Sequence, residues 1–302
     1  MNHILVVGSL AYDSIRTPAG QADRTLGGSA NYFSLAASLH AAVRVVGVVG
    51  SDYSEKDSQL LTSRGVDISG MTRVPGKTFH WAGEYMGDLN EAKTLTTELN
   101  VFEKFNPELP ENYKKSEFVF LANISPDLQL KVLNQVSKPK FVGCDTMNFW
   151  IESKKQDLLD VLKKIDVLLI NDSESKMLTG SSNGLKAAQM ILKMGPRAVV
   201  IKRGEFGFAL CTSDGWFVQP AFPMTEVVDP TGAGDSFAGG FFGHLASQSG
   251  EVTIERLKKA CLYGSITASF TIQGFGVTAL ADLTKAQVEE RLMAFRRVVS
   301  TV

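Results

Sequence analysis

Short apolar runs alternate along most of the chain with segments in which apolar residues recur at helical spacing. Most of the runs are nearly continuous, which is the pattern of strands buried on both faces of a parallel sheet. The predicted strands are residues 4–7, 43–49, 118–121, 141–144, 167–170 and 198–202. The first predicted helix begins at residues 27–31. Further helices are predicted near 54–64, 127–136, 153–164, 184–194, 234–247, 253–272 and 284–298. This alternation predicts an α/β fold with a doubly wound, mostly parallel sheet and helices on both faces.

Two segments interrupt this alternation. Residues 11–26 are polar and rich in turn formers, and residues 78–99 are rich in Thr and aromatic residues with partial alternation. We expect them to form a small antiparallel sheet, a lid that stands off the main sheet; an exposed surface hairpin is the alternative for 78–99. Residues 206–211 and 216–218 predict a terminal antiparallel pair. Without a repeat or a low-complexity linker, the prediction is one domain over residues 1–302 with an inserted lid.

Composition excludes several classes of protein. The 302 residues are 44% hydrophobic and 21% charged, with a formal net charge of -1, so neither nucleic acid nor an anionic membrane is expected as a partner. The three cysteines, Cys144, Cys211 and Cys261, are far apart and are expected to be free thiols. No apolar run approaches the length of a membrane helix. A cytoplasmic protein is the expectation.

The most informative stretch is residues 228–237, Val-Asp-Pro-Thr-Gly-Ala-Gly-Asp-Ser-Phe, a turn that runs into an apolar helix. Gly232, Ala233 and Gly234 have little or no side chain, so a ligand can approach the unpaired N–H groups of the helix start. Together with the helix dipole, these groups favour a phosphate. Asp235 adds a carboxylate at the same place; taken alone it would be interpreted as a helix N-cap. An anion hole beside an acid-base group is what phosphoryl transfer to an alcohol requires.

The string D-x-T-G-A-G-D-[ST]-F resembles the C-terminal signature of the ribokinase/PfkB carbohydrate kinase family, which includes nucleoside kinases such as adenosine kinases. The resemblance implies a ribokinase-like fold and a kinase that uses ATP and Mg²⁺. It also implies that Asp235 is the catalytic base, that Gly232, Ala233 and Gly234 form the anion hole, and that Thr231 lies at the nucleotide. A requirement for a monovalent cation such as K⁺ is compatible with it.

A second match lies near the N-terminus. Residues 27–31, Gly-Gly-Ser-Ala-Asn, resemble the family's N-terminal signature of two glycines followed by an Asn, and Asp13 follows the first strand. The resemblance implies that Asp13 binds substrate hydroxyls and that Gly27, Gly28 and Asn31 contact the substrate. Without it, Asp13 would be interpreted as a turn residue and the glycines as the turn that caps the next helix.

Two further segments concern the nucleotide. Asn171 and Glu174 resemble the N-x-x-E motif, which implies a Mg²⁺ site that Glu174 reaches through water; helix capping is the alternative. Residues 202–207, Lys-Arg-Gly-Glu-Phe-Gly, resemble the strand-end turn over the phosphates. They place Lys202, Gly204 and Gly207 at the nucleotide, although a solvated charge would explain Lys202 equally well. Gly274, after the helix expected to flank adenine, completes the set.

The substrate is less specified. Many sugar kinases of the family carry D-x-N-x-R, but residues 145–150 contain no Arg, which disfavours an acidic or phosphorylated sugar. Aromatic side chains near the site can stack on a base or a sugar face: Phe79, Trp81, Tyr85, Phe149 and Trp150. The prediction is therefore a kinase for a neutral polyol, a sugar first and a nucleoside as the alternative. Retention of Asp235 and the glycines opposes a non-catalytic sugar-binding module. His80 is a candidate substrate contact, and the resemblance suggests a homodimer through the lid.

Overall fold

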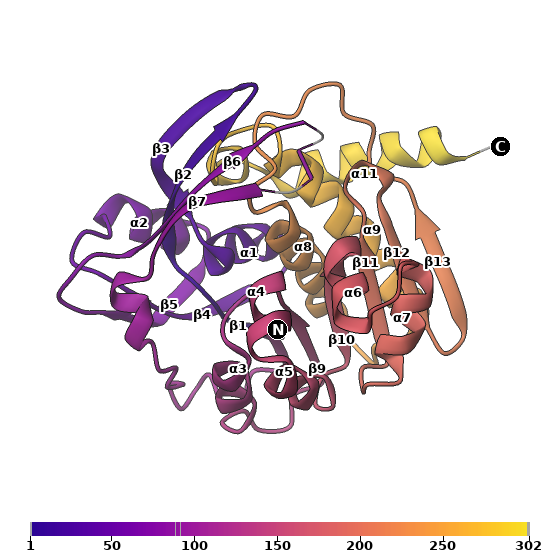
Figure 1. Ribbon diagram of the computed structural model, residues 1–302, viewed down its shortest axis with the longest axis horizontal. Coiled ribbons are helices and arrows are strands. Elements are labelled where there is room, and N and C mark those ends of the chain that lie inside the picture. Colours follow the sequence, from indigo (N-terminus) through magenta and orange to yellow (C-terminus); the bar gives the residue numbers. More distant parts are fainter. Residues whose placement is uncertain (1, 88, 91, 301–302) are drawn as a thin grey trace.

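A nine-stranded sheet in the order β13-β12-β11-β10-β9-β8-β1-β4-β5 forms the centre of the computed structural model, which describes residues 2–87, 89–90 and 92–300 (Figure 1). All neighbouring strands are parallel except at the β11-β12-β13 edge, where pairing is antiparallel. The strands are β1 (His3–Val7), β4 (Ala42–Val49), β5 (Val66–Arg73), β8 (Phe118–Leu121), β9 (Phe141–Asp145), β10 (Val167–Asn171), β11 (Ala198–Lys202), β12 (Phe208–Thr212) and β13 (Gly215–Gln219). The predicted doubly wound fold is confirmed.

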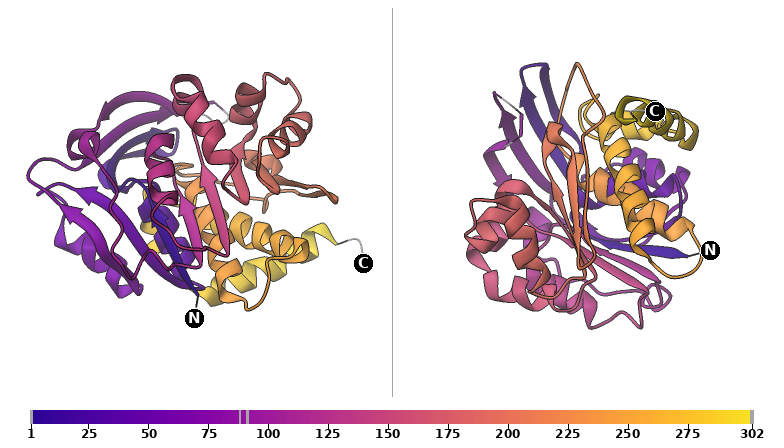
Figure 2. Two further views of the ribbon diagram at one scale, coloured as in Figure 1. Left: turned by 90° about the horizontal axis from the view of Figure 1, so that it is seen from below. Right: turned by 90° about the vertical axis from the view of Figure 1, so that its right-hand side faces the viewer.

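Helices cover both faces of this sheet (Figure 2). One face packs against α1 (Ser29–Ser38), α2 (Glu55–Ser63), α8 (Ala233–Ser247), α9 (Ile254–Thr271), α10 (Thr278–Ala281) and α11 (Lys285–Val299). The other face packs against α3 (Pro126–Leu133), α4 (Asn148–Ser153), α5 (Lys155–Leu162), α6 (Asp172–Thr179) and α7 (Gly184–Leu192). Alternate residues of β1 enter the two cores, Ile4 on one side and Leu5 on the other, which explains its continuous apolar run.

Helix α8 lies close against α1 because glycines face the contact. A Cβ placed on Gly239 would lie 2.5 Å from the carbonyl oxygen of Phe33, and one on Gly243 would lie 2.8 Å from that of Ala37. Larger residues would push the helices apart. This close packing fixes where the N-terminus of α8 lies relative to the ends of the strands.

The lid is a second sheet with the order β3-β2-β6-β7, formed by β2 (Ala11–Thr17), β3 (Gly20–Gly27), β6 (Phe79–Tyr85) and β7 (Ala92–Glu98). The two predicted segments do meet in one sheet, as expected. The antiparallel pairing expected is found between β2 and β3 and between β6 and β7, but it was wrong for the central pair, because β2 and β6 pair in parallel. The chain passes through β3, α1, β4, α2 and β5 between them, and this long connection returns it in the same direction.

Two other expectations need correction. No strand was expected at β5, which lies at the edge of the main sheet and carries polar residues such as Asp67 and Ser69. The helix expected near 153–164 is α5, but the short helix α4 that precedes it was not expected; Lys154, with φ of -136° and ψ of 38°, separates the two. Within the described ranges, no helix is long and apolar enough to cross a membrane.

Candidate active site

Asp13 lies in a recess formed by Gly27 and Gly28. It projects from β2 with only 5% of its surface exposed. A Cβ on Gly27 would overlap its carboxylate, so only glycine leaves room for it. The N–H group of Gly28, a residue with φ of +88°, donates a hydrogen bond to the carboxylate. The motif that was interpreted as a substrate site therefore holds the Asp13 carboxylate in place.

Asn31 is also at this site but is fully buried in α1. Its amide nitrogen donates to the carbonyl oxygen of Gly27 at 2.6 Å, and its side-chain oxygen accepts from the hydroxyl of Tyr53 at 3.2 Å. These bonds position the glycine loop. A direct contact between Asn31 and the substrate stays a prediction.

The C-terminal motif contains a glycine that no other residue could replace without strain. Gly232 has φ of +74°, and a Cβ there would overlap the ring of Tyr32. It is the N-cap of α8, with no side-chain cap, and Ala233 begins the helix. The first N–H groups of a helix have no intrahelical acceptor, so this uncapped end fits an anion; the N–H group of Ala233 donates to the carbonyl oxygen of Pro230 at 3.2 Å. Asp235 lies within the first turn, so the N-cap interpretation of Asp235 is wrong.

Asp229 braces this turn, a role that sequence reasoning did not assign. It is fully buried, and its two carboxylate oxygens accept from the N–H groups of Thr231 at 2.8 Å and Gly276 at 3.0 Å. Thr17 of the lid donates to the carbonyl oxygen of Val228 at 2.7 Å. The sequence signal that could have indicated this role is the Asp at the start of the glycine motif, which is a second Asp in addition to Asp235.

Asp13 and Asp235 are electrostatically linked across the site. The pKa of Asp235 is raised to about 7: burial is the largest cause, the charge of Asp145 acts in the same direction, and Lys202 opposes the shift. Burial also raises the pKa of Asp13 to about 7, against the Gly28 hydrogen bond and with support from the charges of Asp229 and Asp235. A carboxyl group whose pKa lies near neutral pH is suited to general base catalysis.

Lys202 lies beside the anion hole as one member of a buried ion pair. Its Nζ atom, at the end of β11, is 3.0 Å from Oδ2 of Asp145 at the end of β9, and the side chains are 17% and 7% exposed. A Cβ on Gly234 would lie 2.9 Å from the same Nζ. Burial alone would lower the pKa of Lys202, but the charges of Asp145 and Glu174 raise it, so the ammonium stays charged.

A groove of about 1020 Å³ opens next to the anion hole. Five residues predicted to bind nucleotide line it: Asn171, Lys202, Gly204, Gly207 and Gly234. Its apolar wall comes from α9 and the segment before α8, with Phe222, Val227, Ala268 and Ile272. Thr231 and Gly274 are not among its lining residues. Thr231 bonds within the site, whereas Gly274 packs against Thr278 at the start of α10.

Asn171 and Glu174 form the helix cap that was the alternative to a metal site. The N–H group of Glu174 donates to Oδ1 of Asn171 at 2.7 Å, and that of Asn171 donates to Oε2 of Glu174 at 3.0 Å. In the described part of the chain, no group of three His, Cys, Asp or Glu side chains could hold a metal. Carboxylate and amide oxygens, such as those of Glu174 and Asn171, are donors that suit a Mg²⁺ ion contacted through water.

His80 does not face the site. It alternates with Trp81 along β6, and its two ring nitrogens lie 2.9 Å from Oγ of Ser14 and 3.2 Å from Oε2 of Glu98. Asp13 is on the opposite face of the lid, in register with Trp81. The interpretation of His80 as a substrate contact was wrong.

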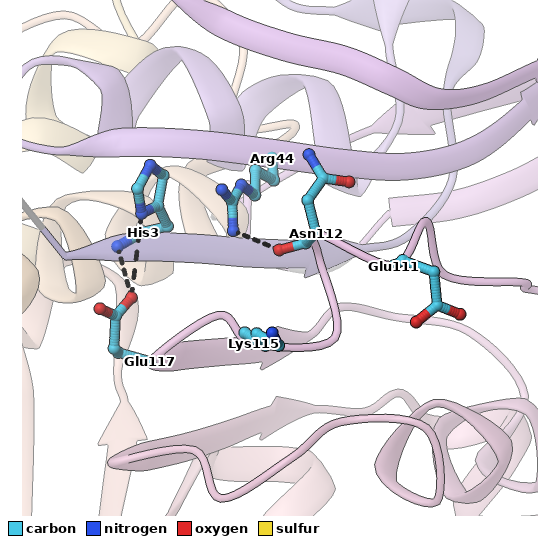
Figure 3. A pocket seen from close by; sticks show the side chains of 6 residues that line it. All are labelled: His3, Arg44, Glu111, Asn112, Lys115 and Glu117. Carbon is cyan, nitrogen blue, oxygen red and sulfur yellow. Dashed lines mark hydrogen bonds and ion pairs between the residues drawn. The ribbon is translucent and has the colours of Figure 1, made fainter.

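A second hollow, of about 440 Å³, lies at the amino ends of the strands, where β1 and β8 begin (Figure 3). Its charged groups bond to neighbouring protein atoms. Arg44 donates to the carbonyl oxygen of Asn112 at 2.8 Å, and Glu117 accepts from the N–H group of His3 at 3.0 Å. Ligands of doubly wound sheets bind at the carboxyl ends of the strands, so this hollow is not the active site.

Comparison with known proteins identifies the family. A family model described as pfkB family carbohydrate kinase matches residues 1–284. The chain belongs to this family. It is therefore an ATP-dependent kinase, a phosphotransferase with an alcohol group as acceptor.

Individual relatives refine the comparison. The chain is 34% identical over 249 residues to a cytidine kinase of Thermococcus kodakarensis, which covers 80% of this chain and 87% of that protein. The crystal structure of Methanocaldococcus jannaschii nucleoside kinase superposes with a TM-score of 0.76 at 23% identity, covering 97% of this chain and 99% of that one. The structure of a putative ribokinase II from E. coli, in complex with ATP and Mg²⁺, superposes with a TM-score of 0.81 at 18% identity, covering 97% of this chain and 100% of that one. The two structures establish the ribokinase-like fold.

Proposed function

We propose that this kinase transfers the γ-phosphoryl group of ATP to a hydroxyl group of a nucleoside. The observation that carries the proposal is the 34% identity to a cytidine kinase over most of both chains. The comparisons thus favour the nucleoside alternative over the neutral sugar that the sequence analysis places first. The ribose of a nucleoside presents the same neutral hydroxyl groups that Asp13 is expected to bind.

The side chains of the site divide the reaction between them. Asp13 holds neighbouring hydroxyl groups of the acceptor. Asp235 takes the proton of the attacking hydroxyl as its oxygen bonds to the γ-phosphorus and the bond to the departing ADP oxygen breaks. The amides of Gly232, Ala233 and Gly234 at the start of α8 stabilise the charge in transit.

The groups that accompany ATP have their places in this proposal. Mg²⁺ bound with ATP would neutralise phosphate charge, and Asn171 and Glu174 are the residues that would hold its waters. Lys202, Gly204 and Gly207 line the groove where the phosphates would lie. The proposal includes a requirement of the kinase for a monovalent cation such as K⁺, which is tested by leaving K⁺ out of the assay.

The experiment for the proposed function is an ADP-release assay with ATP and Mg²⁺. Cytidine, uridine, adenosine and guanosine are compared with ribose, fructose and myo-inositol. A nucleoside is expected to give the highest kcat/KM. A free sugar that exceeds every nucleoside would contradict the proposal and restore the carbohydrate kinase interpretation.

Asp13→Ala is expected to weaken nucleoside binding by about 1.5–3 kcal/mol, the usual worth of hydrogen bonds to a charged group. Alanine has no carboxylate, so the hydroxyl groups of the nucleoside lose the group to which they donate. Nucleoside KM is measured together with the KM for ATP, which should stay unchanged because the nucleotide groove is separate. Asp214→Ala, in the exposed turn between β12 and β13, is the matched control. Unchanged nucleoside KM and kcat in Asp13→Ala would remove Asp13 from the site.

We also propose that residues 1–302 form one domain with an inserted lid and that the lid pairs two subunits. The support is the edge strand β7, all seven residues of which are exposed. Exposed apolar side chains gather around it: Met86, Leu95 and Leu99. Light scattering after size exclusion should give about twice the 32.8 kDa chain mass. Leu95→Lys should lower that mass, and a monomeric mass of the unmodified protein at micromolar concentration would refute the pairing.

A further inference from the structure

One face of the lid covers the active site. Asp13 on β2 and Trp81 on β6 are aligned neighbours in a parallel pair, so their side chains point to the same face. Both strands contact the loop 228–231 at their C-terminal ends. The hydroxyl of Thr17, the last residue of β2, donates to the carbonyl oxygen of Val228, and the hydroxyl of Tyr85, the last residue of β6, accepts from that of Thr231 at 3.3 Å. Trp81 therefore lies on the covering face, next to Asp13.

The indole ring of Trp81 lies across Gly83. A Cβ placed on Gly83 would overlap the six-membered ring, so the ring occupies the space of the missing side chain. The indole N–H group donates to Oγ1 of Thr94 on β7 at 3.2 Å, which orients the ring. A residue larger than glycine at position 83 would displace it.

The ring is also left without an aromatic partner of its own. Phe79 on the same strand stacks on Phe102, and Phe149 packs against Trp150. Among the residues that the structure describes, Trp81 stacks on no ring, and it is only partly buried. A flat aromatic surface, oriented by a hydrogen bond and facing a substrate site, is suited to a planar ligand group.

We propose that Trp81, oriented by Thr94 and accommodated by Gly83, is the surface on which the base of the acceptor nucleoside stacks. Neighbouring strands lie about 4.8 Å apart. A single ligand can therefore place its ribose hydroxyls on Asp13 and its base on Trp81. The inference rests on the proposed nucleoside kinase function and makes Trp81 the residue that separates nucleosides from free sugars.

Trp81→Leu tests the stacking because leucine keeps apolar bulk but has no aromatic face. KM for cytidine should rise roughly 5- to 150-fold, which corresponds to the loss of one stacking contact between an aromatic side chain and a base. KM for ATP should stay the same, and so should kcat/KM for ribose, which has no base. Trp81→Phe should restore most of the cytidine affinity. Trp216→Phe, on β13 with 38% of its surface exposed, is the matched control.

Gly83→Ala gives an independent test, since the added methyl group displaces the ring while Trp81 itself stays. Its KM for cytidine should rise as in Trp81→Leu, with an unchanged KM for ATP. Intrinsic fluorescence provides a readout without turnover. Cytidine should quench the emission of the unmodified protein and of Trp216→Phe, and the quenched component should be absent from Trp81→Leu.

The outcomes distinguish this inference from the proposed function. If the unmodified protein phosphorylates nucleosides but Trp81→Leu leaves KM for cytidine within twofold, the stacking role is overturned and the proposed function stands. The same holds if Trp81→Leu raises KM for ribose as much as for cytidine. If the unmodified protein phosphorylates no nucleoside, both fail.

Discussion

Asp235→Asn is expected to lower kcat by at least about 10²–10⁴-fold, the contribution of a positioned acid-base group. Asparagine has the size of aspartate but cannot accept a proton at neutral pH. The fold should survive, because the N-cap of α8 is Gly232 and the side chain at 235 has no capping role. ATP affinity should stay the same or increase, since a negative charge facing phosphate is removed.

This prediction is checked by measuring kcat with the best nucleoside, ATP binding by calorimetry and thermal melting on one preparation. Asp214→Asn, in the exposed turn between β12 and β13, controls for a general effect of losing a carboxylate. A folded Asp235→Asn protein that binds ATP and keeps near-normal kcat would show that Asp235 is not the base.

The pH dependence gives a further measurement on the same variant. In the unmodified protein the pKa of Asp235 is raised to about 7, so the basic form of its carboxyl group appears only as the pH rises through that value. The kcat of the unmodified protein should rise over the same pH range. Ionisation of this group is also more costly in the folded protein than in the unfolded chain, so it lowers stability as the pH rises from about 4 through 7. Asp235→Asn should therefore melt at a higher temperature than the unmodified protein at pH 8, but not at pH 4.

Lys202→Met is expected to lower kcat by about 10²–10³-fold, the loss typical of removing one preorganised electrostatic group. The ammonium lies beside Gly234, where the charge of the transferring phosphoryl group would develop. The substitution also leaves the buried Asp145 carboxylate without its partner, which typically costs about 3–5 kcal/mol of stability.

A double variant separates these two effects. Lys202→Met combined with Asp145→Asn removes the unpaired charge, so the melting temperature should recover while kcat stays low. Both quantities are measured for the single and double variants. If kcat recovers together with stability, the role of Lys202 is structural and it does not contact the phosphoryl group.

The sequence by itself determined most strands of the main sheet and the principal motifs, because those signals are local. A strand buried on both faces needs a continuous apolar run, as at residues 118–121 and 198–202, where the predicted and observed bounds agree. The start of the helix after the Gly-Ala-Gly-Asp string is also a local signal, and the predicted helix from residue 234 is observed from Ala233. The cap between Asn171 and Glu174 is local as well and was recognised as an alternative.

Only the tertiary structure decided which distant residues meet. Lys202 and Asp145 are far apart in the chain and pair because β9 and β11 lie on either side of β10, an order that no local pattern specifies. The parallel pairing of β2 with β6 places Asp13 beside Trp81 on the covering face and turns His80 away from it. Strand register and direction depend on how the whole chain packs, because a shift of one residue reverses the face of every side chain.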